Sequence, residues 1–310
     1  MPVTITKTPI ALPRLVNVTK TAATVTGGAF GDRQYTIRGL VTNGTDNPKT
    51  AKNATAGITK CISMLPATLG GIGNLCPFAD DCALTCLNYT GRGSLPTTMF
   101  ARLARTIVFQ LARDWSLETI ARQLTNAQKN ADRLEQTLFF RGNMLTDYPW
   151  ESTGLVDNFP RVRWYDYTKN PKRAGRLRAN YWVTFSRGSS NDSAVAEVLK
   201  RGCNVAMVFH NENGKCGRYA HEQTLPANIW IGDDGDDSGY KRAGRSYPVR
   251  DGGLTDLREF DPIDKRQGGK CHTPSVIGLR LLAHTREKRQ TAIDSGFSIQ
   301  YPFTDHTLCA

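Results

Sequence analysis

Three closely spaced cysteines are the residues of this sequence with the clearest chemistry. Cys76, Cys82 and Cys86 lie in the run CPFADDCALTC, directly after the glycine-rich stretch GGIGN at 70–74. Tetrahedral zinc and a cubane iron–sulfur cluster both need several thiolates within a few ångströms, which one loop with three cysteines can supply. The sequence therefore predicts a metal centre in this loop, either a [4Fe–4S] cluster or zinc.

Two further cysteines are candidates for a fourth ligand. Cys61 lies in the apolar run before the loop, and Cys271, in GGKCHTP, precedes the last predicted strand. If neither coordinates, the fourth position is open, as catalysis at a metal requires. The alternative is that the three loop cysteines are buried structural residues, because free cysteine is often part of a core.

The elements that must position this loop alternate between strand and helix. An apolar run at 58–67 predicts a strand before the loop, and amphipathic patterns predict helices at 97–115 and 116–136 after it. Further strands are expected at 137–143, 161–169, 180–186, 204–209, 246–252 and 275–282, with a helix at 189–203. Apolar strands separated by helical crossovers indicate an α/β protein, a partial or closed (β/α) barrel of mainly parallel strands.

The chain of 310 residues divides into two parts on composition. Residues 1–55 are rich in Thr, Asn, Ala and Gly, which predicts a β-rich N-terminal extension. Residues 56–310 are expected to form one barrel-like domain that carries the Cys loop at 76–86 and a polar insertion at 211–245.

Polar residues at the ends of the predicted strands are the candidates for catalysis. In a parallel barrel, side chains at the carboxyl ends of strands face the reaction site. The candidates chosen by this rule are Asn143, Asp147, Asp166, Lys169 and Asp251. Each could instead be a loop cap or one half of an ion pair.

The charge of the chain favours a polyanionic partner. It has 40 Lys and Arg against 28 Asp and Glu, a net charge of +12, and nucleic acid is the leading candidate. The basic run KNPKRAGRLR lies between two aromatic-rich strands, so we expect nucleic acid to bind Lys172, Arg173, Arg176 and Arg178. The alternatives are that the aromatic residues are core and that the chain is a basic enzyme without a nucleic-acid role.

Membrane and export signals are absent from the pattern. The N-terminal residues have no basic segment followed by an apolar run, and no window approaches the roughly 18 apolar residues of a membrane span. We therefore expect a soluble, cytoplasmic protein with neither disulfides nor a membrane partner.

Several of these segments resemble a phage and plasmid family named after mycobacteriophage gene product eighty-eight. The resemblance covers roughly residues 45–300, and its most specific parts are CPFADDCALTCLNYTGRG at 76–93 and the YDYTK run at 165–169. Weaker matches are NPKTAKN (47–53), RGNMLTDYPWE (141–151), NYWVTFSRGSSN (180–191) and VRDGGLTDLREFDP (249–262). The resemblance implies a phage or mobile-element protein that acts in a bacterial host.

The order of strand, cysteine loop, helix and successive strands also resembles the partial barrel of radical S-adenosylmethionine enzymes. That resemblance implies a [4Fe–4S] cluster on the three loop cysteines, with one iron left for S-adenosylmethionine. The spacing here differs from the usual Cys-X3-Cys-X2-Cys, with five and three intervening residues. We expect a radical-type enzyme acting on nucleic acid or a nucleotide, or else a non-catalytic nucleic-acid-binding protein with a structural zinc or cluster.

Overall fold

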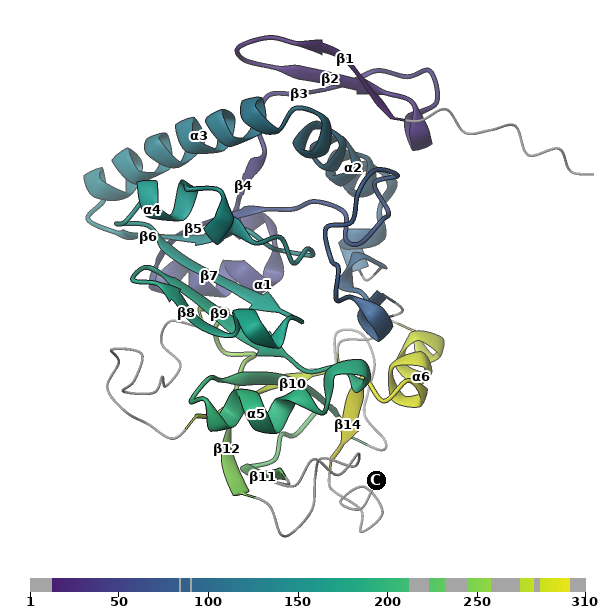
Figure 1. The fold of residues 1–310 in the computed structure, drawn as a ribbon, viewed down its shortest axis with the longest axis vertical. Coiled ribbons are helices and arrows are strands. Elements are labelled where there is room, and N and C mark those ends of the chain that lie inside the picture. The colour runs from purple at the N-terminus through teal and green to yellow at the C-terminus, as the bar shows by residue number, and fades with distance from the viewer. Residues whose placement is uncertain are drawn as a thin grey trace, which may run out of the picture.

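Two sheets organise the computed structural model of this chain (Figure 1). The structure describes residues 13–83, 85–89, 91–211, 223–231, 245–257, 274–281 and 285–301. The small sheet has the strand order β1-β2-β3, and the large, mostly parallel sheet has the order β11-β12-β13-β10-β9-β7-β6-β5-β4. The predicted α/β class is confirmed at this level.

Three short strands form the small antiparallel sheet: β1 (Arg14–Val18), β2 (Ala23–Thr26) and β3 (Tyr35–Ile37). They lie in the predicted N-terminal extension and contact helix α2 (Pro96–Leu111), where the rings of Phe30 and Phe100 stack at a centroid distance of 5.6 Å. Figure 1 shows this sheet beyond α2 and α3 (Arg113–Arg133), on the far side from the large sheet. Residues 41–55 belong with the large sheet, because β4 pairs with β5.

In the described part of the chain, seven strands run parallel through the large sheet, in the spatial order β5 (Gly57–Ile62), β6 (Thr137–Arg141), β7 (Arg163–Thr168), β9 (Tyr181–Ser186), β10 (Val205–His210), β13 (Val276–Arg280) and β12 (Arg245–Asp251). The marginal strands are β4 (Val41–Asn43), β8 (Gly175–Arg178) and β11 (Asn228–Ile231), all antiparallel to their partners, and β14 (Ser298–Gln300), parallel to β10. Each strand predicted from an apolar run is present with small shifts of its ends, except that the strand predicted at 58–67 already ends at Ile62.

The two long helices also follow the prediction. Leu103, Ile107 and Val108 of α2 are buried, as its amphipathic pattern requires, whereas the apolar Phe100 and Leu111 of the same helix are exposed. The remaining helices are α1 (Pro48–Ala51), α4 (Leu155–Asn158), α5 (Ala194–Lys200) and α6 (Arg286–Asp294).

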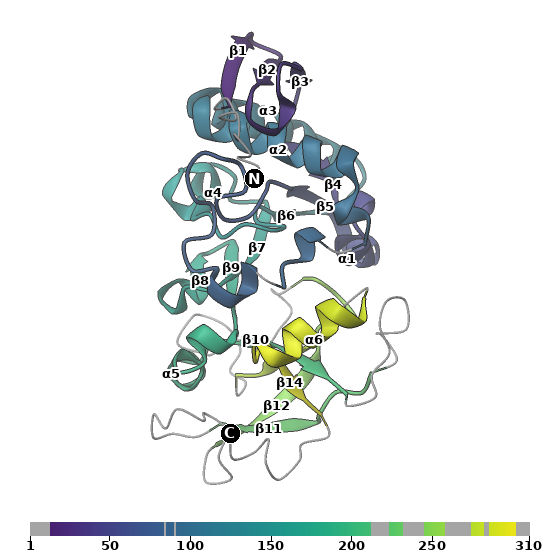
Figure 2. The ribbon, with the colours of Figure 1, turned by 90° about the vertical axis from the view of Figure 1, so that its right-hand side faces the viewer.

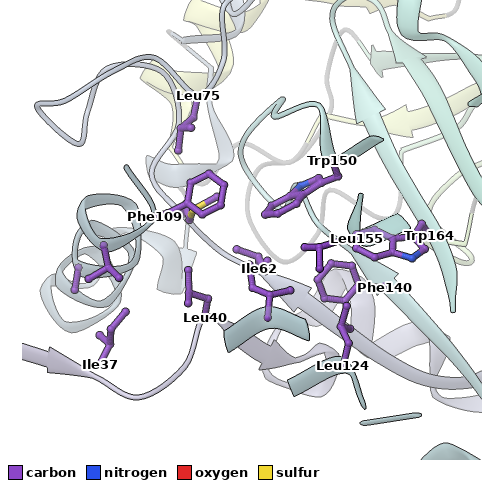
Figure 3. Close-up of a cluster of buried hydrophobic side chains, with 14 of the residues drawn as sticks. Ile37, Leu40, Ile62, Leu75, Phe109, Leu124, Phe140, Trp150, Leu155 and Trp164 are labelled. Carbon is purple, nitrogen blue, oxygen red and sulfur yellow. The ribbon is translucent and has the colours of Figure 1, made fainter. Parts of the chain in front are cut away.

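The main hydrophobic core lies between the two long helices and one face of the large sheet (Figure 3). The strands contribute Ile62, Phe140 and Trp164, and the helices contribute Phe109 and Leu124, all of them fully buried. Burial of each large apolar side chain stabilises the fold by about 1.5–3 kcal/mol. The core therefore fixes both ends of the segment that joins β5 to α2, which is the segment that carries the cysteines.

The opposite face of the sheet is crossed by the segment that follows β12. There the side chain of Asp256 forms a buried ion pair with Arg141, with 2.5 Å between Nη1 and Oδ2, and its backbone N–H donates to Oδ1 of Asn53. The described strands leave β4 and β11 at opposite ends of the strand order. The large sheet is therefore open over the described residues, and closure into a complete barrel is not found.

Candidate metal centre

The candidate site lies at the carboxyl edge of the parallel strands. Because β5, β6, β7 and β9 are parallel, the loops that follow them leave the sheet at the same edge. The loop after β5 carries the cysteines and includes short 3-10 turns, such as Asp80–Ala83 and Leu87–Tyr89. The first turn contacts the turn Ser189–Asn191 after β9. Figure 2 looks onto this side of the molecule, where the Cys loop lies above α6.

Each of the three thiols is at least partly withdrawn from solvent. Cys76 is buried and its Sγ donates to the backbone oxygen of Leu145 at 3.5 Å, in the loop after β6. Cys82 and Cys86 are half-buried, and the backbone N–H of Asn88 donates to Sγ of Cys86 at 3.5 Å. The Cys loop is thus held against the neighbouring strand-end loop through one of its own cysteines.

Burial keeps two of the three thiols protonated. Burial, with smaller contributions from the charges of Asp147, Cys86 and Cys82, raises the pKa of Cys76 to about 12. Burial, with a smaller contribution from Cys82, raises the pKa of Cys86 to about 11. Cys76 and Cys86 are therefore protonated at neutral pH, so a metal that binds them must displace protons.

The predicted fourth ligands are not brought to the loop in the described residues. The sulfur of Cys61 lies 3.3 Å from Oγ1 of Thr42, on the neighbouring strand β4. Cys271 lies outside the described residues. Across the described residues, no three His, Cys, Asp or Glu side chains are grouped closely enough to hold an ion.

Within the described residues, two buried polar atoms near Cys86 have no hydrogen-bond partner. They are Oγ1 of Thr85 and Nδ2 of Asn88. The other side of the Asn88 amide accepts a hydrogen bond of 2.9 Å from the buried guanidinium of Arg102, so its orientation is set. Buried polar atoms in proteins are almost always satisfied, and an exception marks a place where an absent group can bind. The donors present around Cys86 fit a bound anionic centre.

Two candidate catalytic residues, Asn143 and Asp166, meet in a buried network at the ends of β6 and β7. The carboxylate of Asp166 accepts from the backbone N–H of Asn143 at 2.8 Å, from its Nδ2 at 3.1 Å and from the hydroxyl of Tyr181 at 2.9 Å. Oδ1 of Asn143 in turn accepts from Oγ1 of Thr146, the N–H of Tyr148 and Nε1 of Trp150. The network therefore sets the shape of the loop that contacts Cys76.

Burial raises the pKa of Asp166 from its ordinary value of 3.8 to about 7, although Arg141, Asn143, Tyr181 and Arg173 all act to lower it. The carboxyl thus changes charge near physiological pH. A group of this kind is a candidate for proton transfer, or for coupling the shape of its loop to pH.

Asp147 connects this network to the Cys loop. Its backbone N–H donates to the oxygen of Leu75 at 2.8 Å, one residue before Cys76. Its carboxylate accepts from Oγ1 of Thr168 and from the N–H of Lys169, each at 2.9 Å, and forms an ion pair of 2.5 Å with Arg173. The ammonium of Lys169 reaches the backbone oxygen of Arg187 after β9. Asn143, Asp147, Asp166 and Lys169 therefore lie together at the edge predicted for the site.

Asp251 lies apart from the other candidates. It ends β12, which β13, β10 and β9 separate from β7. Burial acts to raise its pKa, but the ion pair with Arg280 at 2.7 Å outweighs that effect and the pKa is lowered. Asp251 therefore fixes a turn at the far end of the sheet, at a distance of several strands from the Cys loop.

Comparison of the chain with protein families gives a match. A model of the family described as Gene product 88 matches residues 39–296. The chain belongs to this gene product 88 family. The resemblance expected from the sequence is confirmed in that respect, whereas no curated protein and no solved structure matches the chain. The Cys loop and the Asp147 and Asp166 network fall inside the family match, and the small N-terminal sheet, which ends at Ile37, falls outside it.

The basic residues expected to bind nucleic acid have different surroundings in this family member. Lys172 is exposed, whereas Arg173 is engaged by Asp147 and Glu151 within the site network. Arg178 is exposed and pairs with Asp157 at 3.0 Å, and the guanidinium of Arg176 lies over the ring of Trp182. The neighbouring aromatic side chains, Trp164, Tyr165, Tyr181 and Trp182, are buried in the core. These four rings are therefore not exposed for base stacking, whereas Tyr167 of β7 is partly exposed.

Sequence reasoning had missed several members of the site. Arg102, on the helix predicted at 97–115, was not identified as a site residue, but it is buried and donates to Ser63, Asn88 and Gly93. Arg173 was assigned to nucleic acid because it lies in a basic run, and Tyr181 belongs to one of the aromatic-rich strands beside that run. The signal that could have identified them is a charged or polar residue whose spacing along a helix or strand places it on the same side as core residues.

None of the described helices is long and apolar enough to cross a membrane.

Proposed function

We propose that this member of the gene product 88 family is a phage or mobile-element iron–sulfur protein of radical type. Cys76, Cys82 and Cys86 hold the [4Fe–4S] cluster at the carboxyl edge of a partial barrel. The substrate class we propose is nucleic acid or a nucleotide, because the chain carries a net charge of +12. The enzyme acts in the cytoplasm of the bacterial host.

One observation carries this proposal. Three cysteines of a single loop follow the first parallel strand at the carboxyl edge of the sheet, where Cys76 contacts the loop that carries Asn143 and Asp147. A purely structural loop has no need for three cysteines within eleven residues at an edge that also gathers buried polar side chains. Oγ1 of Thr85 and Nδ2 of Asn88, which lack hydrogen-bond partners among the described residues, are available to hydrogen-bond a group bound there.

The residues of the chain have separable tasks in this proposal. The three thiols bind the cluster, and the buried Arg102 offsets negative charge at Cys86, whose pKa it lowers. Asp147 holds the Cys loop against β7, and Asp166 holds a proton near the edge of the sheet. Together with S-adenosylmethionine, a cluster of this type supplies one-electron radical chemistry.

Metal content is the decisive measurement. The full chain is purified anaerobically, its absorbance is recorded near 400 nm, and iron and zinc are quantified. We expect a brown protein with about four irons per chain. Cys82→Ala should lose most of the iron, because the loop then retains two of its three thiols.

The matched control is Cys203→Ala. Cys203 is also buried, but its sulfur contacts the backbone oxygen of Ala174, away from the Cys loop. This variant should keep its iron, with circular dichroism confirming that both variants are folded. One zinc per chain would instead support the alternative of a non-catalytic nucleic-acid-binding protein with a structural zinc. Full metal content in Cys82→Ala would remove the ligand assignment.

A further inference from the structure

The outward face of the small sheet carries threonine hydroxyls and, among the described residues, no carboxylate, although Val16 and Val18 of β1 are also exposed. Ala23, Val25 and Ile37 belong to the hydrophobic core, so the alternate residues Thr24 and Thr36 face away from it. Their hydroxyls form a cross-strand hydrogen bond of 2.7 Å. Figures 1 and 2 both show the sheet at one end of the molecule, beyond α2 and α3. This face is therefore presented to a partner from outside.

Four basic side chains surround this face. Arg14, Lys20, Arg33 and Arg38 are all exposed, and over the described part of the chain their side chains form no ion pair or hydrogen bond. Between residues 13 and 38, Asp32 is the one acidic residue in the sequence, which leaves this segment with a net charge of +3. These four side chains can therefore bind phosphate without first breaking an ion pair to a carboxylate.

The basic residues lie at both ends of the sheet. Lys20 is in the turn between β1 and β2, and Arg38 directly follows β3, at the end where Ala23 pairs with Val18 and Ile37. Arg14 and Arg33 lie at the other end, beside Thr26, which pairs with Arg14 and whose hydroxyl donates to the backbone oxygen of Arg33. The two ends of the sheet are three residues apart along β2, from Ala23 to Thr26, which corresponds to about 10 Å. This distance is close to the roughly 12 Å width of the major groove of DNA.

The sheet is fixed to the body of the protein. Nε1 of Trp115 on α3 donates to the backbone oxygen of Thr19 at 2.7 Å, and Nη1 of Arg122 donates to that of Lys20 at 3.1 Å. The apolar side of the sheet is part of the main core. A partner that binds the outward face therefore meets a preorganised surface, with little ordering cost.

We infer that the small sheet binds the sugar–phosphate backbone of nucleic acid, without sequence preference. Arginine, lysine and threonine side chains are the usual donors to phosphate oxygens. The basic run at 172–178 is less suited, since Arg173 and Arg178 already pair with carboxylates. The inference rests on the proposed nucleic-acid substrate, but none of its residues belongs to the Cys loop, so it does not depend on the proposed metal centre.

The test compares two triple variants of equal charge in the full chain. The first is Arg14→Ala, Lys20→Ala and Arg38→Ala, and the second is Lys172→Ala, Arg176→Ala and Arg178→Ala. Binding to a fluorescein-labelled 20-base-pair DNA duplex, a matching RNA duplex and anionic phospholipid vesicles is measured from 0.05 to 0.3 M salt. Each phosphate contact adds about 0.9 to the slope of log affinity against log salt for DNA. The first variant should therefore lose about 2.7 in slope, equivalent to about a hundredfold in affinity at 0.15 M salt, if all three side chains contact phosphate.

The second variant should keep most of the slope. Equal losses in the two variants would show that net charge alone governs binding, and a loss confined to the second would place the surface at 172–178. Both results overturn the inference, as does a wild-type protein that binds vesicles but no duplex. Thermal unfolding of each variant, together with its metal content, separates these outcomes from misfolding or from failure of the metal proposal.

Discussion

The buried carboxyl of Asp166 gives the sharpest prediction about stability, tested by replacing it with Asn. The side chain is fully buried on β7 and accepts hydrogen bonds from Asn143 and Tyr181. Burial raises its pKa to about 7, against an ordinary value of 3.8 in the unfolded chain. The substitution preserves shape but removes the titration.

The sign of the effect follows from where the proton is held. Between pH 3.8 and about 7, folded Asp166 keeps a proton that the unfolded chain has released. The stability due to the protonated carboxyl is complete below the unfolded pKa and is lost as pH rises through the folded pKa. For a shift of about three pKa units, the loss reaches at most about 4 kcal/mol, of which about 2–3 kcal/mol falls between pH 5 and pH 8.

The Asp166→Asn variant should be less stable than wild type at pH 5. The amide nitrogen of the new side chain cannot accept a hydrogen bond, so Nδ2 of Asn143 loses its acceptor. A lost buried hydrogen bond of this kind costs about 1–3 kcal/mol. Urea unfolding of both proteins at pH 5, 6, 7 and 8 should show this difference shrinking by about 2–3 kcal/mol as pH rises, since other groups cancel in the comparison. A difference that stays constant over this range would refute the reasoning, because Asp166 would then be ionised throughout.

Two further outcomes follow from buried groups. Asp256→Ala should lower the free energy of unfolding by about 3–5 kcal/mol, because it leaves the buried guanidinium of Arg141 without its carboxylate partner. Adding Arg141→Met should restore most of that loss. A loss below about 1 kcal/mol in urea titrations would argue against this ion pair. In the metal-free protein, the sulfur of Cys76 should react with iodoacetamide at pH 7.5 on the order of a thousandfold more slowly than glutathione, because little of it is thiolate. Peptide mass spectrometry follows this reaction, and rapid labelling at pH 7.5 would contradict the raised pKa of Cys76.

Local patterns in the sequence determined the elements of this protein. Helical spacing of apolar residues predicts α2 and α3, and short apolar runs predict the parallel strands, because both signals arise within a few turns or residues of chain. The placement of Cys76, Cys82 and Cys86 in one loop after the first parallel strand also follows from spacing alone. Polar residues at the carboxyl ends of parallel strands are expected to share one edge of the sheet. This rule predicts the edge at which Asn143, Asp147, Asp166 and Lys169 lie.

Only the tertiary structure decided which of those polar residues meet. Asp147 and Arg173 are 26 positions apart, and their ion pair depends on how two loops fold back over β7. Asp251 obeys the same strand-end rule but lies several strands away, because β12 pairs with β13 at the far side of β10. Strand order and the burial of groups such as Arg102 arise from contacts between distant segments, and no local period in a sequence encodes them.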